Sequence, residues 1–229
     1  MCSPPETVSI LADLVALQAD LTVPVGALGL VIFCHGSGSS RHSVRNREVA
    51  ASLQARRLGT LLLDLLSEDE EHQDIATGRW RFDVSLLASR VESAVRWART
   101  DPRTAGLPLG LFGASTGAAA ALVAAAGLED VVSAVVSRGG RPDLAGPALS
   151  SVYAPTLLIV GGYDRQVLAL NQQAAKLLTS VQLTIVPRAT HLFDKPGVMQ
   201  QVSALAGDWF LRYLACPEHR ADPDVGYCD

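Results

Sequence analysis

The chain has 229 residues, 48% of them hydrophobic, which is enough for one large domain with a sizeable core. Its 19 basic and 23 acidic residues are mixed along the sequence and give a formal net charge of −4. There is no basic stripe of the kind that neutralises nucleic-acid phosphates, so we expect no nucleic-acid partner.

The sequence shows neither of two membrane signals, a signal peptide or a membrane-spanning run. Residues 1–10 lack the basic start and apolar stretch of a signal peptide, and the Ala-rich run 117–128 is too short to cross a bilayer. We therefore expect a cytoplasmic protein without a membrane partner.

The four cysteines show no C-x-x-C spacing. Cys34 is predicted to be a buried free thiol, and whether Cys216 and Cys228 pair is left open.

The predicted elements begin with residues 8–23, where apolar and polar positions alternate as in an antiparallel edge pair. After this pair, apolar runs of strand length alternate with segments of helical period, and there are no internal repeats. Strands that are apolar throughout are buried on both faces, which predicts an α/β fold with a mostly parallel sheet and helices on both sides. Strands are expected at 28–34, 60–66, 107–115, 132–137, 154–162 and 181–187, and helices at 46–59, 85–100, 117–130, 168–180 and 197–214.

Three stretches interrupt this alternation. Residues 67–83 are acidic at first and aromatic later, and we interpret them as a solvated surface loop, with a substrate-lining role as the alternative. The connection 137–153 is short, which predicts an open site without a lid domain. Residues 215–229 have no periodicity, so the expected organisation is a single domain, 1–214, followed by a C-terminal tail.

A Gly- and Ser-rich loop, 35–40, follows the first buried strand. A phosphate loop would need a Lys after Gly38, and none is present. A dinucleotide fingerprint would need a third glycine where Arg41 stands. The remaining interpretation is an oxyanion loop, whose backbone N–H groups bind negative charge on a substrate oxygen. Such a loop requires a serine nucleophile elsewhere in the chain.

The sequence Gly113-Ala-Ser-Thr-Gly117 supplies that serine. It matches G-x-S-x-G, a sharp turn that forces Ser115 into a strained backbone conformation and tolerates no bulk two residues to either side. An apolar strand runs directly into the motif, and the Ala-rich segment after it would permit close packing of a helix on the sheet. The motif therefore predicts that Ser115 is a nucleophile. The alternative is an ordinary strand-to-helix turn.

The order of elements, the H-G-S-G loop and the G-A-S-T-G turn resemble the α/β-hydrolase superfamily over nearly the whole chain. The small size and the short 137–153 connection most resemble its compact, dienelactone-hydrolase-like esterases. The resemblance implies a Ser-His-Asp triad and no metal or organic cofactor. Dienelactone hydrolases proper use a cysteine nucleophile, whereas this chain has Ser115, so their substrate is not carried over.

In such hydrolases the acid and then the histidine follow the nucleophile along the chain. His191 comes just after the last predicted strand and is the expected general base; downstream of Ser115 the only other histidine is His219, in the tail. Asp164 ends the preceding strand in the family's G-x-x-D position and is the expected acid. Alternatively Asp164 caps the next helix, and Asp143 is the reserve acid.

The predicted oxyanion donors are the backbone N–H groups of Ser37 and Thr116, with His35 bracing the loop rather than doing chemistry. The expected function is hydrolysis of carboxylic esters, lactones or thioesters of a small molecule through an acyl-enzyme on Ser115. An acyltransferase would look the same, and a hydrolase fold without turnover that serves as a binding module is the alternative from another class. The sequence predicts neither the substrate nor the oligomeric state.

Charged side chains follow the ends of two predicted strands. Arg41, His42 and Arg45 come after the Gly-Ser loop, and Arg138 and Arg141 come after the strand next to the elbow. Arg is suited to bidentate capture of an anionic group, so Arg41, His42, Arg138 and Arg141 are candidate substrate-binding residues. The alternative is that the arginines pair with acidic residues and anchor loops.

Overall fold

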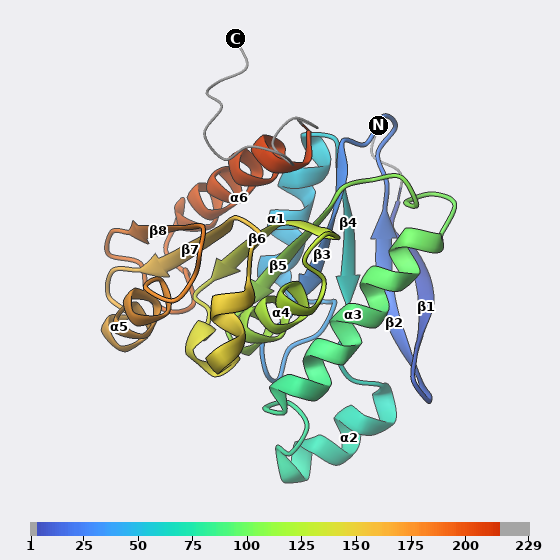
Figure 1. Ribbon diagram of the computed structural model, residues 1–229, viewed down its shortest axis with the longest axis horizontal. Coiled ribbons are helices and arrows are strands. Elements are labelled where there is room, and N and C mark those ends of the chain that lie inside the picture. Colours follow the sequence, from blue (N-terminus) through green and yellow to red (C-terminus); the bar gives the residue numbers. More distant parts are fainter. Residues whose placement is uncertain (1–3, 216–229) are drawn as a thin grey trace.

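An eight-stranded sheet runs through the middle of the computed structural model, which describes residues 4–215 (Figure 1). The strands are β1 (Glu6–Ala12), β2 (Val15–Thr22), β3 (Gly29–Cys34), β4 (Leu58–Leu63), β5 (Leu109–Ala114), β6 (Val132–Arg138), β7 (Thr156–Gly161) and β8 (Val181–Val186). Their order across the sheet is β1-β2-β4-β3-β5-β6-β7-β8. β2 pairs antiparallel with both of its neighbours, and every other neighbouring pair is parallel.

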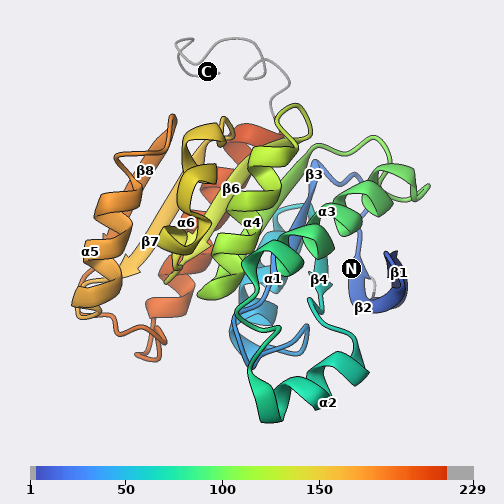
Figure 2. The same cartoon turned by 60° about the horizontal axis from the view of Figure 1, so that its bottom comes forward.

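Helices cover both faces of the sheet (Figures 1 and 2). One face packs on α1 (Val44–Ala55) and α6 (Val198–Leu214), and the other on α3 (Val84–Thr100), α4 (Thr116–Gly127), the 3-10 helix η1 (Pro142–Ser151) and α5 (Arg165–Ala174). Successive residues of a strand point to opposite faces, so Ile32 belongs to one core cluster and Phe33 to the other. The predicted α/β-hydrolase architecture is thereby confirmed.

The central strands are buried because both of their faces are covered. Every residue of β3, β4, β5 and β7 is buried, as expected from their continuous apolar sequences. Cys34 is a buried free thiol, as predicted, and burial raises its pKa to about 12. This thiol is therefore a core residue without thiolate chemistry at neutral pH.

The edge pair β1–β2 is antiparallel, also as predicted. Its alternating sequence puts one side chain of each pair of neighbours into the core: Ile10 is fully buried, whereas Leu11 next to it is 74% exposed.

The connection from β6 to β7 consists of η1, so the described chain carries no separate lid domain. Among residues 4–215, no helix is long and apolar enough to span a bilayer. Cys216, Cys228 and the tail beyond 215 lie outside the described residues.

The interpretation of 67–83 as a loop is wrong, because the segment contains the helix α2 (Glu68–Thr77). Ser67 and Glu70 form a capping box, in which the Ser67 side chain accepts from the Glu70 N–H and the Glu70 carboxylate accepts from the Ser67 N–H. Gly78 ends the helix in the left-handed conformation. Figures 1 and 2 place α2 outside the two helical layers.

Candidate active site

Ser115 occupies the sharp turn between β5 and α4. Its φ of 51° and ψ of −122° lie in a region that residues with side chains rarely adopt. The predicted strained backbone is therefore present at this serine. The N–H of Ser115 donates to the carbonyl of Arg138 at 3.4 Å, and its carbonyl accepts from the N–H of Arg141 at 3.1 Å. These bonds tie the turn to the segment that follows β6.

The two glycines of the motif are required by close backbone approaches. A Cβ on Gly117 would lie 2.3 Å from the carbonyl oxygens of both Cys34 and His35, and a Cβ on Gly113 would lie 2.3 Å from the Cα of Ala118. No side chain fits at these separations. The glycines thus let α4 approach β3 and β5 closely enough to make the turn.

His191 and Asp164 are in contact on neighbouring loops. The Nδ1 atom of His191 lies 2.7 Å from Oδ2 of Asp164, and the side chains are 42% and 14% exposed. An ionised carboxylate only accepts, so in the neutral imidazole Nδ1 carries the hydrogen and Nε2 keeps its lone pair. Asp164 occupies the N-cap position of α5, yet its side chain makes no capping hydrogen bond. The capping alternative therefore does not describe this side chain.

The contact depends on how the loops after β7 and β8 pass each other. A Cβ on Gly161 would lie 2.5 Å from the carbonyl of Ala189 and 2.6 Å from that of Thr190, so only glycine lets the His191 loop come this close. The Tyr163 N–H donates to the Ala189 carbonyl at 2.9 Å. The reserve acid, Asp143, instead binds the guanidinium of Arg141, with N–O distances of 2.8 Å and 2.7 Å.

Ser115 and His191 both lie against the segment that follows β6. Arg138 accepts from the Ser115 N–H, and a Cβ on the next residue, Gly139, would lie 3.7 Å from His191 Nδ1. On the other side of the serine, a Cβ on Gly36 would lie 3.7 Å from Ser115 Oγ. The predicted nucleophile, base, acid and oxyanion loop are thus gathered at the carboxyl ends of β3, β5, β7 and β8.

His35 holds the oxyanion loop through both ring nitrogens. Nε2 accepts from the Leu65 N–H at 3.0 Å, so Nδ1 carries the hydrogen that binds the Gly36 carbonyl at 2.9 Å. Burial lowers the pKa of His35, against the opposing effects of the Gly36 carbonyl and the carboxylates of Asp64 and Glu71. A neutral imidazole with both nitrogens engaged has the bracing role predicted for it.

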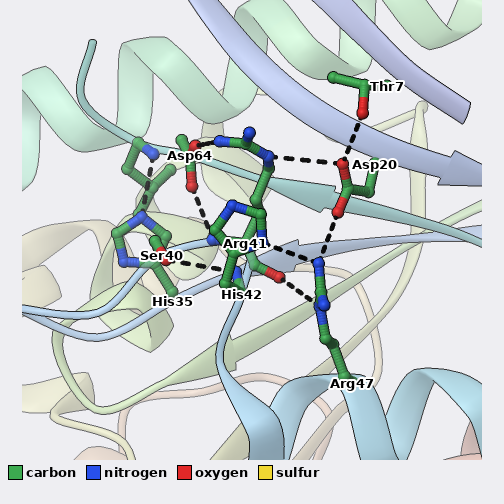
Figure 3. A network of polar contacts seen from close by, with 9 residues as sticks. Thr7, Asp20, His35, Ser40, Arg41, His42, Arg47 and Asp64 are labelled. Carbon is green, nitrogen blue, oxygen red and sulfur yellow. Dashed lines mark hydrogen bonds and ion pairs between the residues drawn. The ribbon is translucent and has the colours of Figure 1, made fainter. Parts of the chain in front are cut away.

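Arg41 belongs to a network of polar contacts behind the same loop (Figure 3). Its backbone N–H donates to Asp64 at 2.6 Å, and its guanidinium pairs with both Asp64 and Asp20. Arg47 binds Asp20 at 2.9 Å, donates through Nε to the Arg41 carbonyl at 3.4 Å and lies 2.7 Å from His42 Nδ1. These contacts favour the loop-anchoring alternative for Arg41. Asp64 was not singled out in the sequence, where nothing marks it as the partner of a residue 23 positions away.

Arg138 and Arg141 have different surroundings. Arg141 is paired with Asp143, whereas Arg138 is buried, donates to the Asn46 side chain at 3.1 Å and lies over the Phe193 ring. Burial and then the charge of Arg45 lower the pKa of Arg138 to about 10. Among the described residues neither Arg138 nor Arg45 has a carboxylate within ion-pair distance. Anion binding by Arg138 therefore stays a prediction.

The two predicted oxyanion residues contact each other. The Ser37 N–H donates to the side-chain hydroxyl of Thr116 at 2.9 Å. Thr116 is the first residue of α4, where the backbone N–H has no acceptor within the helix. The Thr116 amide is thus free of helix hydrogen bonds, whereas the Ser37 amide is bonded to the Thr116 side chain.

A cavity of about 330 Å³ opens beside this pair. Ser115 is not among its lining residues, but Ser37 and Thr116 are, and apolar side chains of Leu65, Leu66, Ile75 and Leu87 form much of its wall. Asp74 and Arg81 also line it and bind each other, with Arg81 Nε 2.5 Å from Asp74 Oδ2. The segment 67–83 thus supplies part of the wall. The S-x-x-E capping box was the sequence signal that marked its helix.

Within residues 4–215, no cluster of three or more His, Cys, Asp or Glu side chains is arranged to hold a metal ion.

Comparisons with known proteins show the family of this chain. The model of the dienelactone hydrolase family matches residues 49–212. The structure of a dienelactone hydrolase from Anabaena variabilis shares 53% sequence identity and a TM-score of 0.90, covering 93% of this chain and 100% of that one. Est1E from Butyrivibrio proteoclasticus, at 16% identity and a TM-score of 0.78, covers 93% of this chain and 100% of its own, and shares the fold.

Two curated proteins from Mycobacterium tuberculosis strains are 55% identical over 213 residues, or 93% of this chain. Each is named "Putative phosphoribosyl transferase". The chain spans about half the length of these curated relatives, 47%.

Proposed function

The chain belongs to the dienelactone hydrolase family, and we propose that it is a serine hydrolase of carboxylic esters in which Ser115, His191 and Asp164 form the catalytic triad. The observation that carries this proposal is the side chain of Asp164. It stands at a helix N-cap but binds His191 instead of the helix amides. A carboxylate that makes no capping hydrogen bond and instead binds an imidazole fits a catalytic acid better than a capping residue.

The proposed reaction has two halves. Ser115 Oγ forms a bond to the carbonyl carbon, its proton passes to His191 Nε2, and the π electrons of the carbonyl move to the oxygen. The carbonyl then re-forms as the carbon–oxygen bond to the alkoxide breaks, and His191 gives its proton to the departing alkoxide, so that the acyl group remains on Ser115. Water repeats the sequence in the second half, with His191 as its base. Asp164 keeps the hydrogen on Nδ1 and stabilises the imidazolium that forms in each half.

We place one part of the substrate in the cavity of about 330 Å³ beside the oxyanion residues. Its apolar walls suit a hydrocarbon group. Of its acidic lining residues, Asp74 pairs with Arg81 and Asp64 with Arg41, whereas no ion pair is recorded for Glu71 among the described residues. Arg41 and Arg141 are paired with carboxylates and His42 contacts Arg47, so Arg138 is the candidate we retain for an anionic substrate group.

The transferase name belongs to the mycobacterial relatives as whole proteins. This chain covers only 47% of their length. That name does not decide the chemistry of the segment. An acyltransferase is the alternative that keeps the same triad, since another alcohol or amine would replace water in the second half.

Hydrolysis of a panel of aryl esters with acyl chains of different lengths tests the proposal. The wild type should turn over at least one ester, and Ser115→Ala should lower kcat/KM by several orders of magnitude, roughly as in other triads. Ester turnover that survives unchanged in Ser115→Ala would remove the serine from the mechanism. A wild type that binds esters without turnover would instead identify a binding module.

A further inference from the structure

The hydrogen bond between Ser37 and Thr116 bears on how the oxyanion is bound. The Ser37 N–H lies 2.9 Å from Thr116 Oγ1, within the usual range for such a bond. An amide hydrogen makes its best bond along one direction. In this structure that direction is taken by the threonine hydroxyl, so the amide does not point freely at a substrate oxygen.

The same bond leaves the hydrogen of the hydroxyl unused. A threonine hydroxyl accepts through two lone pairs and donates one hydrogen. The Ser37 amide occupies a lone pair, and within residues 4–215 no acceptor is recorded for the hydroxyl hydrogen. Thr116 is only 5% exposed, and it lines the cavity beside the elbow. A buried donor without a protein acceptor at a cavity wall is suited to a ligand oxygen.

We propose that the side-chain hydroxyl of Thr116 is itself a donor to the oxyanion, together with the Thr116 backbone N–H. The Ser37 amide then acts through the hydroxyl: it fixes the side-chain rotamer and, by donating to Oγ1, makes the O–H a stronger donor. No proton is transferred. The hydroxyl keeps its hydrogen while Ser115 Oγ bonds to the carbonyl carbon and the carbonyl oxygen becomes negative. This inference rests on the proposed function and gives Thr116 a second catalytic group.

Three substitutions separate the hydroxyl from the rest of the residue. Thr116→Val keeps the branched shape and removes the hydroxyl, whereas Thr116→Ser keeps the hydroxyl. Thr116→Ala differs from Thr116→Ser only in that oxygen, so this second pair remains informative if the valine variant folds poorly. The matched control is Thr100→Val, since the Thr100 hydroxyl binds the Trp97 carbonyl at the end of α3, away from the elbow.

The measurement is kcat and KM on one neutral aryl ester, with the rate of inactivation by a fluorophosphonate as a second readout. Thr116→Val and Thr116→Ala should lower kcat about 100-fold, the usual cost of one oxyanion donor, with KM changed less than about threefold. The inactivation rate should fall in parallel, because the phosphonyl oxygen occupies the same position. Thr116→Ser should stay within about threefold of the wild type, and Thr100→Val should not differ from it.

A Thr116→Val or Thr116→Ala enzyme with the kcat of Thr116→Ser, or a higher one, would overturn the proposal. It would mean that the hydroxyl only occupies the Ser37 amide until the substrate displaces it. This failure is distinct from failure of the proposed function. In the first case wild type and Thr116→Val both turn over the ester and Ser115→Ala does not, whereas in the second the wild type shows neither turnover nor covalent labelling.

Discussion

Asp164 and Asp143 are both aspartates that follow a buried strand, and their contacts separate them. Asp164 binds His191 and Asp143 binds Arg141. Asp164→Asn should therefore cut kcat by roughly three to four orders of magnitude, because an amide favours the wrong imidazole tautomer. Asp143→Asn should cost less than about tenfold, since it weakens only a half-exposed ion pair. Steady-state kinetics of both variants would move the acid to Asp143 if the ranking came out reversed.

His35 makes the stability of the oxyanion loop depend on pH. Its pKa is lowered in the folded chain by burial, whereas the unfolded chain has the ordinary value of about 6.5. Below about pH 6.5 the unfolded state binds more protons, so the free energy of unfolding should fall as the pH drops toward the folded-state pKa. Above about pH 6.5 this contribution is fully present and constant.

His35→Gln provides the comparison, because glutamine can still donate and accept but does not titrate. Urea unfolding from about pH 7.5 to about pH 5 should show a steeper loss of stability for the wild type than for the variant. Parallel curves for the two proteins would assign the acid sensitivity to other groups.

Single site residues could be predicted from the sequence where a local motif or a position after a strand identifies them. Ser115 lies in a motif defined by its own turn, and Asp164 and His191 each follow a strand. The contact between Ser37 and Thr116 joins residues 79 positions apart, and that between Arg41 and Asp64 joins residues 23 apart. Neither spacing is periodic, so only the folded chain brings these partners together.

Helix α4 is the element whose placement forms the elbow, and Gly117 decides how close it lies to β3. A Cβ at this position would come 2.3 Å from two backbone oxygens, which cannot move without shifting the strand end. Gly117→Ala should therefore destabilise the fold by about 1–3 kcal/mol or more and impair turnover. At Gly106 an added Cβ meets nothing within 4 Å, so Gly106→Ala is the control and should leave both unchanged.

Thermal unfolding and ester kinetics of the two glycine variants check this expectation. A Gly117→Ala protein as stable and as active as Gly106→Ala would mean that α4 can move away from the sheet without loss.

Composition and periodicity predict the elements with continuous apolar sequences, whereas the solvated helix α2 is marked only by its capping box. The strands β3, β5 and β7 are buried on both faces, so composition alone marks them. Helix α2 buries only Asp74, and its opening run of four acidic residues resembles a solvated loop. What holds it is specific: the capping box at Ser67, and Asp74, which accepts from the Trp80 N–H at 2.6 Å and from Arg81. Hydrophobic periodicity does not register such contacts.

Across the whole molecule, the sheet topology brings the proposed catalytic groups together. The strands that carry them, β3, β5, β7 and β8, are parallel, so their carboxyl ends lie along the same edge of the sheet. The chain order of serine, aspartate and histidine matches that of α/β hydrolases. The general location of the site followed from these two rules. The wall formed by α2 did not, because it depends on the side-chain contacts of a single helix.

The most direct test of the central claim is the position of a covalent adduct. The full chain is treated with a fluorophosphonate, digested and mapped by mass spectrometry, alongside Ser115→Ala. We predict stoichiometric modification of the wild type on Ser115, within the peptide that spans the elbow, and no modification of the variant. An adduct on any other residue, or a wild type that stays unmodified, would contradict the assignment of Ser115 as the activated nucleophile.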